Sequence, residues 1–125
     1  MDQHDEMLHT AWADLRGWLD GAEVAQALEQ PSVLAGWTVR ELIAHLGRAF
    51  TTMTGLRPSD EPPLPMLDYV AAYRPVASGI ATATRKQAAE IEGDVLLVVD
   101  QLVADGLAGL AQTTAEVVQG PRGPI

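Results

Sequence analysis

The chain has 125 residues, the usual length of one domain (1–125), and its 47% hydrophobic and 20% charged residues exclude a disordered chain. Seventeen acidic against eight basic residues give a net charge of −9, which disfavours binding to nucleic acids and to anionic membrane surfaces. The absence of cysteine excludes disulfides, thiolate zinc sites and a cysteine nucleophile, and it is consistent with a cytoplasmic protein.

The N-terminal segment predicts an amphipathic helix over about residues 5–20. Four apolar residues recur there at spacings of three and four, which places them on one helix face: Leu8, Trp12, Leu15 and Leu19. The first ten residues are acidic and polar, so they do not resemble a signal peptide. A helical turn is expected over 24–28.

The clearest helix start is the stretch Trp37-Thr38-Val39-Arg40-Glu41. Thr38 can accept a hydrogen bond from the backbone of Glu41, and Glu41 can accept one from the backbone of Thr38, which is the pattern of a capping box. Trp37 and Leu42 add a hydrophobic staple. Because an apolar stripe follows, we expect a helix over 38–54.

The middle of the chain alternates between a loop and helical periodicity. Residues 56–65 hold four prolines and predict a loop. Helical spacing returns over 66–92, where Pro75 is expected to kink or divide the helix and Gly79 to interrupt it. Asp94 is a candidate N-cap for the next helix.

The segment from Val95 to Leu110 is apolar around most of a helix, so we expect this helix at the centre of a bundle. The run Val95–Val99 also suits a buried strand, but the continued spacing to Leu110 favours a helix, and the run is too short to span a membrane. Residues 113–118 favour an extended segment, before two Gly-Pro turn signals. The predicted fold is all-α, a bundle of about four helices with a short extended C-terminal segment.

Three histidines are candidates for metal binding or acid–base chemistry. His4 and His9 are about 140° apart on a helix, so they do not share a metal from one face. His45 lies at the edge of its apolar stripe, about 110° from the centre. Two interpretations of His45 are open: a core-edge histidine bonded to a backbone carbonyl, or a metal ligand facing a cleft between helices.

Residues 31–50, PSVLAGWTVRELIAHLGRAF, resemble the signature of the mycothiol-dependent maleylpyruvate isomerase N-terminal (metal-binding) domain family. This family is part of the DinB-like superfamily of four-helix-bundle metalloenzymes. The resemblance rests on a Gly-Trp-Thr-Val-Arg-acid element, from Gly36 to Glu41, that opens a helix carrying His45 followed by Leu46. The order of helices and of the Pro-rich loop extends the resemblance over nearly the whole chain.

The resemblance implies a metal site, most readily for zinc, in which His45 is joined by a Glu and a His spaced four residues apart on a later helix. It also implies that the metal activates mycothiol or a similar thiol for isomerisation or transfer on a small-molecule substrate. No histidine follows His45, so the Glu-x-x-x-His pair is missing. We expect that pair just beyond Ile125, as if the chain were truncated before the last helix of the family.

Two functional hypotheses follow, and whether the chain is an enzyme stays open between them. In the first, it is a DinB-like metal-binding protein related to mycothiol-dependent isomerases and thiol transferases, catalytically incomplete, with His45 as the first ligand. In the second, it is a non-catalytic helical interaction module that self-associates as a homodimer through apolar surface left uncovered. A metal bound at His45 would discriminate between the two.

Overall fold

The computed structural model describes residues 3–21 and 23–125, and four long helices make up most of this part of the chain. They are α1 (Gln3–Gly21), α2 (Val39–Thr51), α4 (Ala77–Glu90) and α5 (Val95–Ala111). The shorter elements are η1 (Val24–Gln26), α3 (Met66–Ala71), η2 (Arg74–Val76), β1 (Gln119–Gly120) and β2 (Gly123–Pro124). This confirms the predicted all-α bundle with a short extended segment near the C-terminus.

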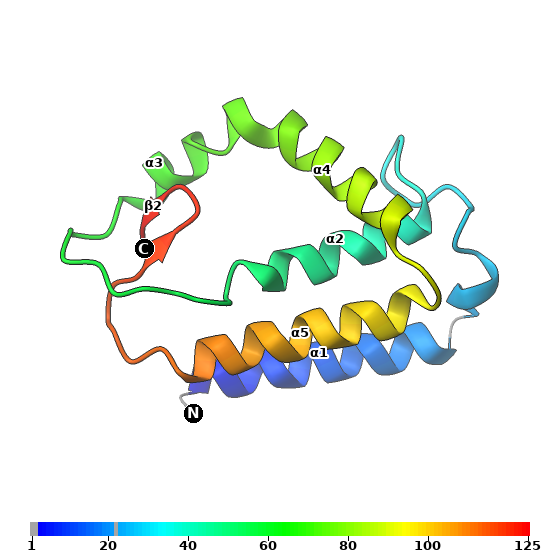
Figure 1. Ribbon diagram of the computed structural model, residues 1–125, viewed down its shortest axis with the longest axis horizontal. Coiled ribbons are helices and arrows are strands. Elements are labelled where there is room, and N and C mark those ends of the chain that lie inside the picture. The colour runs from blue at the N-terminus through cyan, green and yellow to red at the C-terminus, as the bar shows by residue number, and fades with distance from the viewer. Residues whose placement is uncertain (1–2, 22) are drawn as a thin grey trace.

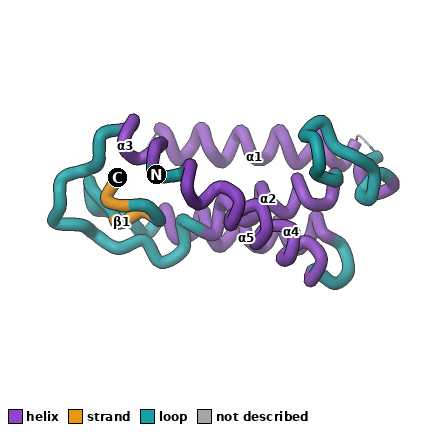
Figure 2. The backbone as a smooth tube through the Cα atoms, turned by 90° about the horizontal axis from the view of Figure 1, so that it is seen from above, coloured by secondary structure: helices purple, strands orange, loops and turns teal. Residues whose placement is uncertain are grey.

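The four long helices are arranged around α2 and α5. α5 packs against both α1 and α2, and α4 packs on the side of α2 that faces away from α5 (Figure 1). α2 and α5 run in the same direction, whereas α1 and α4 run the opposite way (Figure 1). Figure 2 shows that α3, the Pro-rich loop and the small hairpin gather at one end of the bundle. Within the described residues, no helix combines the length and the apolar character needed to cross a membrane.

The hydrophobic core is centred on α5, as its sequence predicts. This helix contributes five members of the buried apolar cluster: Val95, Leu96, Val99, Val103 and Leu107. Leu19 of α1 and Ile43 of α2 pack against them from the two neighbouring helices. The strand alternative for this segment is therefore wrong, because a helix lets its apolar residues face α1 and α2 together.

Several element boundaries differ from the predictions, and one predicted break is confirmed. α2 ends at Thr51 rather than Thr54, and a turn leads to Gly55, whose φ of 68° suits glycine. The turn expected over 24–28 is shortened to η1. Pro75 does divide the next segment, into α3, η2 and α4. Gly79, however, lies inside α4, because a single glycine costs a helix only about 1 kcal/mol.

The extended C-terminal segment begins later than predicted. The strands β1 and β2 lie after residues 113–118 and are joined by Pro121-Arg122, with Gln119 opposite Pro124. The hairpin is bound to the Pro-rich loop, since the N–H of Gln119 donates to the Arg57 carbonyl at 2.8 Å. The hairpin and the loop thus close one end of the bundle as a single unit.

Candidate functional site

The beginning of α2 is built by the predicted capping box. The Thr38 hydroxyl accepts from the Glu41 N–H at 3.1 Å, and the Glu41 carboxylate accepts from the Thr38 N–H at 3.0 Å. The backbone hydrogen bond from Thr38 is the largest cause of a lowered pKa at Glu41, and the charge of Arg85 lowers that pKa further. The N-terminus of α2 is therefore held in one conformation.

Other residues of the Gly36–Glu41 stretch connect α2 to α4. Arg40 donates to the carbonyls of Ala88 and Ile91, which lie at the end of α4, at 3.2 and 2.8 Å. Arg85 of α4 lies over the Trp37 ring at 5.1 Å and forms an ion pair with Glu41 at 3.3 Å. These contacts set the distance between α2 and α4, and the pocket described next lies between these two helices.

His45 is half-buried on the side of α2 that faces α4. Its Nδ1 atom lies 3.5 Å from the hydroxyl of Thr84, a fully buried residue of α4. Its ring packs against Trp37 with centroids 5.5 Å apart. The predicted backbone carbonyl partner is not found among the described residues. A threonine hydroxyl takes that place, so one face and one nitrogen of the ring are held while the other nitrogen is available.

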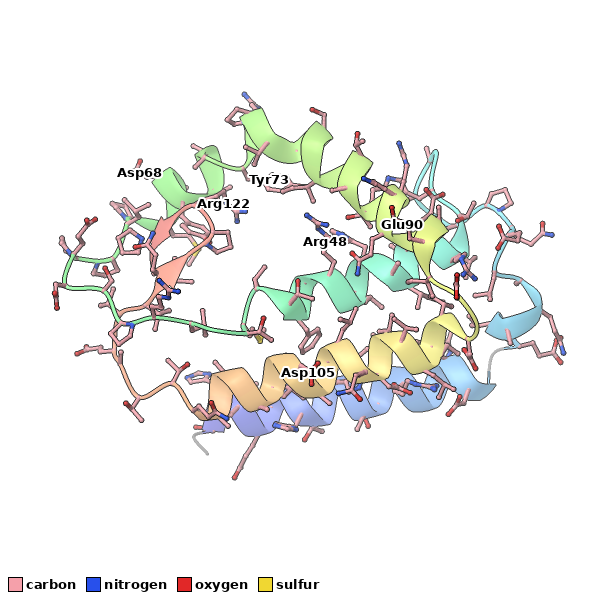
Figure 3. All side chains as sticks on the ribbon, viewed as in Figure 1. Arg48, Asp68, Tyr73, Glu90, Asp105 and Arg122 are labelled. Carbon is pink, nitrogen blue, oxygen red and sulfur yellow. The ribbon has the colours of Figure 1, made fainter. Side chains whose placement is uncertain are left out.

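A pocket of about 260 Å³ opens beside His45. α2 contributes His45, Arg48 and Ala49 to its wall, α4 contributes Ile80, and the hairpin contributes Arg122. The lining is completed by Thr52, Pro121 and Tyr73, the residue that precedes η2. In Figure 3 the side chains of Arg48, Tyr73 and Arg122 point toward the same space between α2, α4 and the hairpin.

The pocket is cationic although the whole chain is acidic. None of its described lining residues is a carboxylate. Arg122 lies over the rings of Tyr69 and Tyr73, at 4.5 and 5.4 Å from their centroids. Within residues 3–21 and 23–125, neither Arg48 nor Arg122 forms an ion pair. Two unpaired guanidinium groups and an imidazole therefore define its electrostatic character.

Comparison with known proteins assigns the chain to a family. Residues 8–124 match the family described as the mycothiol maleylpyruvate isomerase N-terminal domain. The chain belongs to this family. The match is consistent with the DinB-like superfamily and with the helix bundle. No curated protein and no solved structure matches the chain.

The resemblance to the mycothiol isomerase family implies a metal site at His45. Among the described residues, no group of three or more His, Asp or Glu side chains could hold a metal ion. His4 and His9 are exposed on α1, on a helix that does not line the His45 pocket. The arginines beside His45 would repel a divalent cation. The described residues therefore do not fit a complete metal centre, and His45 as a ligand stays a prediction.

The sequence pattern indicates His45 but not the residues that surround it in the pocket. Arg48 follows His45 by one helical turn, so spacing alone places both on one face of α2. Tyr73 and Arg122 carry no such signal, because tertiary packing brings them to the pocket. Thr84 carries none either, because it meets His45 through the packing of α4 on α2. Only the tertiary structure brings them to His45.

Proposed function

We propose that this chain binds a small molecule of the low-molecular-weight thiol class in the His45 pocket and has no complete metal centre of its own. The family name supports the thiol, since it describes a mycothiol-dependent isomerase. The observation that carries the proposal is that His45 lines a pocket with Arg48, Tyr73 and Arg122, and that no described carboxylate joins them. The domain is in this view a relative of isomerases and thiol transferases that retains the ligand site.

His45 is the group through which the pocket would act on a ligand. Thr84 and Trp37 orient the imidazole, which leaves the second ring nitrogen to donate a proton, accept one or ligate a metal. The metal that the family implies would need further ligands from outside the described residues, because the lining offers His45 but no carboxylate.

Mycothiol added to labelled protein should shift the NMR signals of the His45 and Tyr73 rings, and His45→Ala should weaken this binding. His9→Ala is the matched control, because His9 is an exposed histidine on α1. Shifts confined to other parts of the molecule, or equal effects of the two variants, would contradict the proposed site.

Metal content tests the other half of the proposal. Protein purified without a histidine tag should contain far less than one zinc per chain by elemental analysis. Zinc added in excess should bind weakly, and His45→Ala should remove that binding while His9→Ala leaves it. A tightly held zinc in each chain would show that the site is completed, and the metal-free form of the proposal would then be wrong.

A homodimeric interaction module is the second candidate, and exposed apolar residues of α3 favour it. Met66, Leu67 and Val70 are 78%, 82% and 58% exposed. The double variant Leu67→Asp with Val70→Asp should abolish self-association in light scattering, whereas Leu97→Asp on α5 should not, although Leu97 is 64% exposed. A wild-type chain that stays monomeric at high concentration would exclude this candidate.

A further inference from the structure

Arg48 and Arg122 are half-buried in one pocket and form no ion pair in the described part of the chain. Arg57 and Arg74 also form none there, but they are exposed and lie outside this pocket. Arg16, Arg85 and Lys86 form ion pairs, and Arg40 donates to backbone carbonyls. The two pocket arginines instead meet at one hollow with no described carboxylate between them. Like charges brought together in this way repel, and a bound anion would remove the repulsion. The two arginines therefore make this pocket positive in a chain whose net charge is −9.

Arg122 is held in place by the hairpin. Gly120 lies so close to the Tyr69 hydroxyl that a Cβ there would come within 2.9 Å of it, and Gly123 adopts a φ of 135°. Only glycine fits both positions easily. The Arg122 guanidinium rests on two tyrosine rings, and its buried Nε atom has no hydrogen-bond partner in the described part of the chain. A buried donor left unpaired is costly, and a ligand acceptor would satisfy it.

The cationic pocket continues into an apolar hollow. A second cavity, of about 410 Å³, shares Ala49, Thr52, Pro121 and Arg122 with the first. Its remaining wall is mainly aliphatic: Met53, Leu56, Leu110, Val118 and Ile125, with Tyr69 beside them. A ligand whose anionic group lies between the arginines can therefore place an apolar body along this wall.

We propose that Arg48 and Arg122 form a binding site for the carboxylate of a small amphipathic acid, whose apolar part occupies the adjoining hollow. Guanidinium groups bind carboxylates through paired, charge-assisted hydrogen bonds, which suits two arginines that have no internal partner. The aliphatic wall favours an organic acid over inorganic phosphate. The inference rests on the proposed function only in using the same pocket, and it requires neither the thiol nor a metal.

Calorimetric titration with hexanoate, in a buffer of low ionic strength free of carboxylate and phosphate, tests the site on the full chain. Hexanoate should bind, while the uncharged hexanamide should not bind and acetate should bind more weakly. Arg48→Gln and Arg122→Gln should each weaken hexanoate binding about tenfold or more. The matched control is Arg74→Gln, which removes the same charge from an exposed arginine outside this pocket.

Several results would overturn the inference. They are no hexanoate binding to the wild-type chain, equal weakening by all three arginine variants, or tighter binding of inorganic phosphate than of hexanoate. Because Arg122 also supports the hairpin, Arg48→Gln on α2 provides the test that leaves the hairpin contacts intact. Hexanoate binding that persists in His45→Ala would separate this inference from the role proposed for His45, since either can fail without the other.

Discussion

Glu41 is an acid whose ionised form the fold stabilises. It accepts hydrogen bonds from the backbone and the hydroxyl of Thr38, both at 3.0 Å, and it pairs with Arg85. Its pKa is lowered from an ordinary value of 4.5. The stability that this carboxylate contributes is therefore fully present above pH 4.5 and is lost as the pH falls through the lowered value.

Glu41→Gln should lower the free energy of unfolding by about 1 kcal/mol at neutral pH, because it weakens a charged capping box. The difference from wild type should shrink as the pH falls below 4.5. Urea unfolding at neutral and acidic pH measures this. Glu29→Gln, which changes an exposed glutamate, should have little effect at either pH. An equal loss for Glu41→Gln at both values would contradict the assignment.

His45 shows how far residue-level prediction reaches. Its position at the edge of the apolar stripe correctly indicates a half-buried side chain. One of its two interpretations gave it a backbone carbonyl as partner, and the Thr84 hydroxyl lies there instead. Thr84 belongs to α4. The periodicity of a helix does not predict the angle at which it packs against another helix, so the sequence does not indicate this contact.

The packing of α2 against α5 depends on glycines. A Cβ at Gly47 would come within 3.0 Å of the Leu102 side chain. A Cβ at Gly106 would collide with the carbonyl of Phe50, and one at Gly109 with the carbonyl of Met53. Small residues on these faces let the two backbones approach closely, so α5 can bury the residues that form the core.

Gly106→Ala should destabilise the protein by roughly 1–3 kcal/mol, since the steric conflict with backbone outweighs the gain of about 1 kcal/mol in helix propensity. Gly79→Ala is the matched control, because a Cβ at Gly79 would meet nothing within 4 Å. That variant should be neutral or more stable by up to about 1 kcal/mol. Thermal unfolding of both variants measures the contrast, and a stabilised Gly106→Ala would disprove the close approach.

At the scale of the whole molecule, α1 is attached less extensively than the other long helices. Leu19 is its only buried residue within Gln3–Gly21. Trp12 packs against Phe50 with centroids 5.9 Å apart, and Arg16 bridges to Asp100 of α5 at 2.7 Å. The hydrogen bond to Asp100 is the main cause that raises the pKa of Arg16, so the guanidinium stays charged. A cavity of about 520 Å³ remains between α1 and α5.

We expect α1 to open separately from the rest of the bundle, because few apolar contacts hold it. Amide hydrogen exchange should be faster in α1 than in α2 and α5, with the fastest exchange in its N-terminal half. Asp100→Asn should accelerate exchange in α1 further and leave α2 unchanged. Equal protection of α1 and α5 would show that the four helices unfold as one unit.

Local patterns in the sequence were sufficient to predict the long helices, the capping box, the central place of α5 and the family. These depend on local spacing: Thr38 and Glu41 are three residues apart, and the apolar period of Val95 to Leu110 requires burial on most sides. The boundaries at Thr51 and within 113–124 were less accurate, because turns and hairpin pairing depend on distant backbone partners such as Arg57.

The chemistry of the pocket depends on contacts between segments that are distant in the sequence. Arg48, Tyr73 and Arg122 come from three separate segments, and they meet only because the hairpin packs against the end of the bundle. The spacing of residues in the sequence predicts which side chains share a helix face. It does not predict which faces meet, since that depends on the close approach of α2 to α5 and on the glycines that position Arg122.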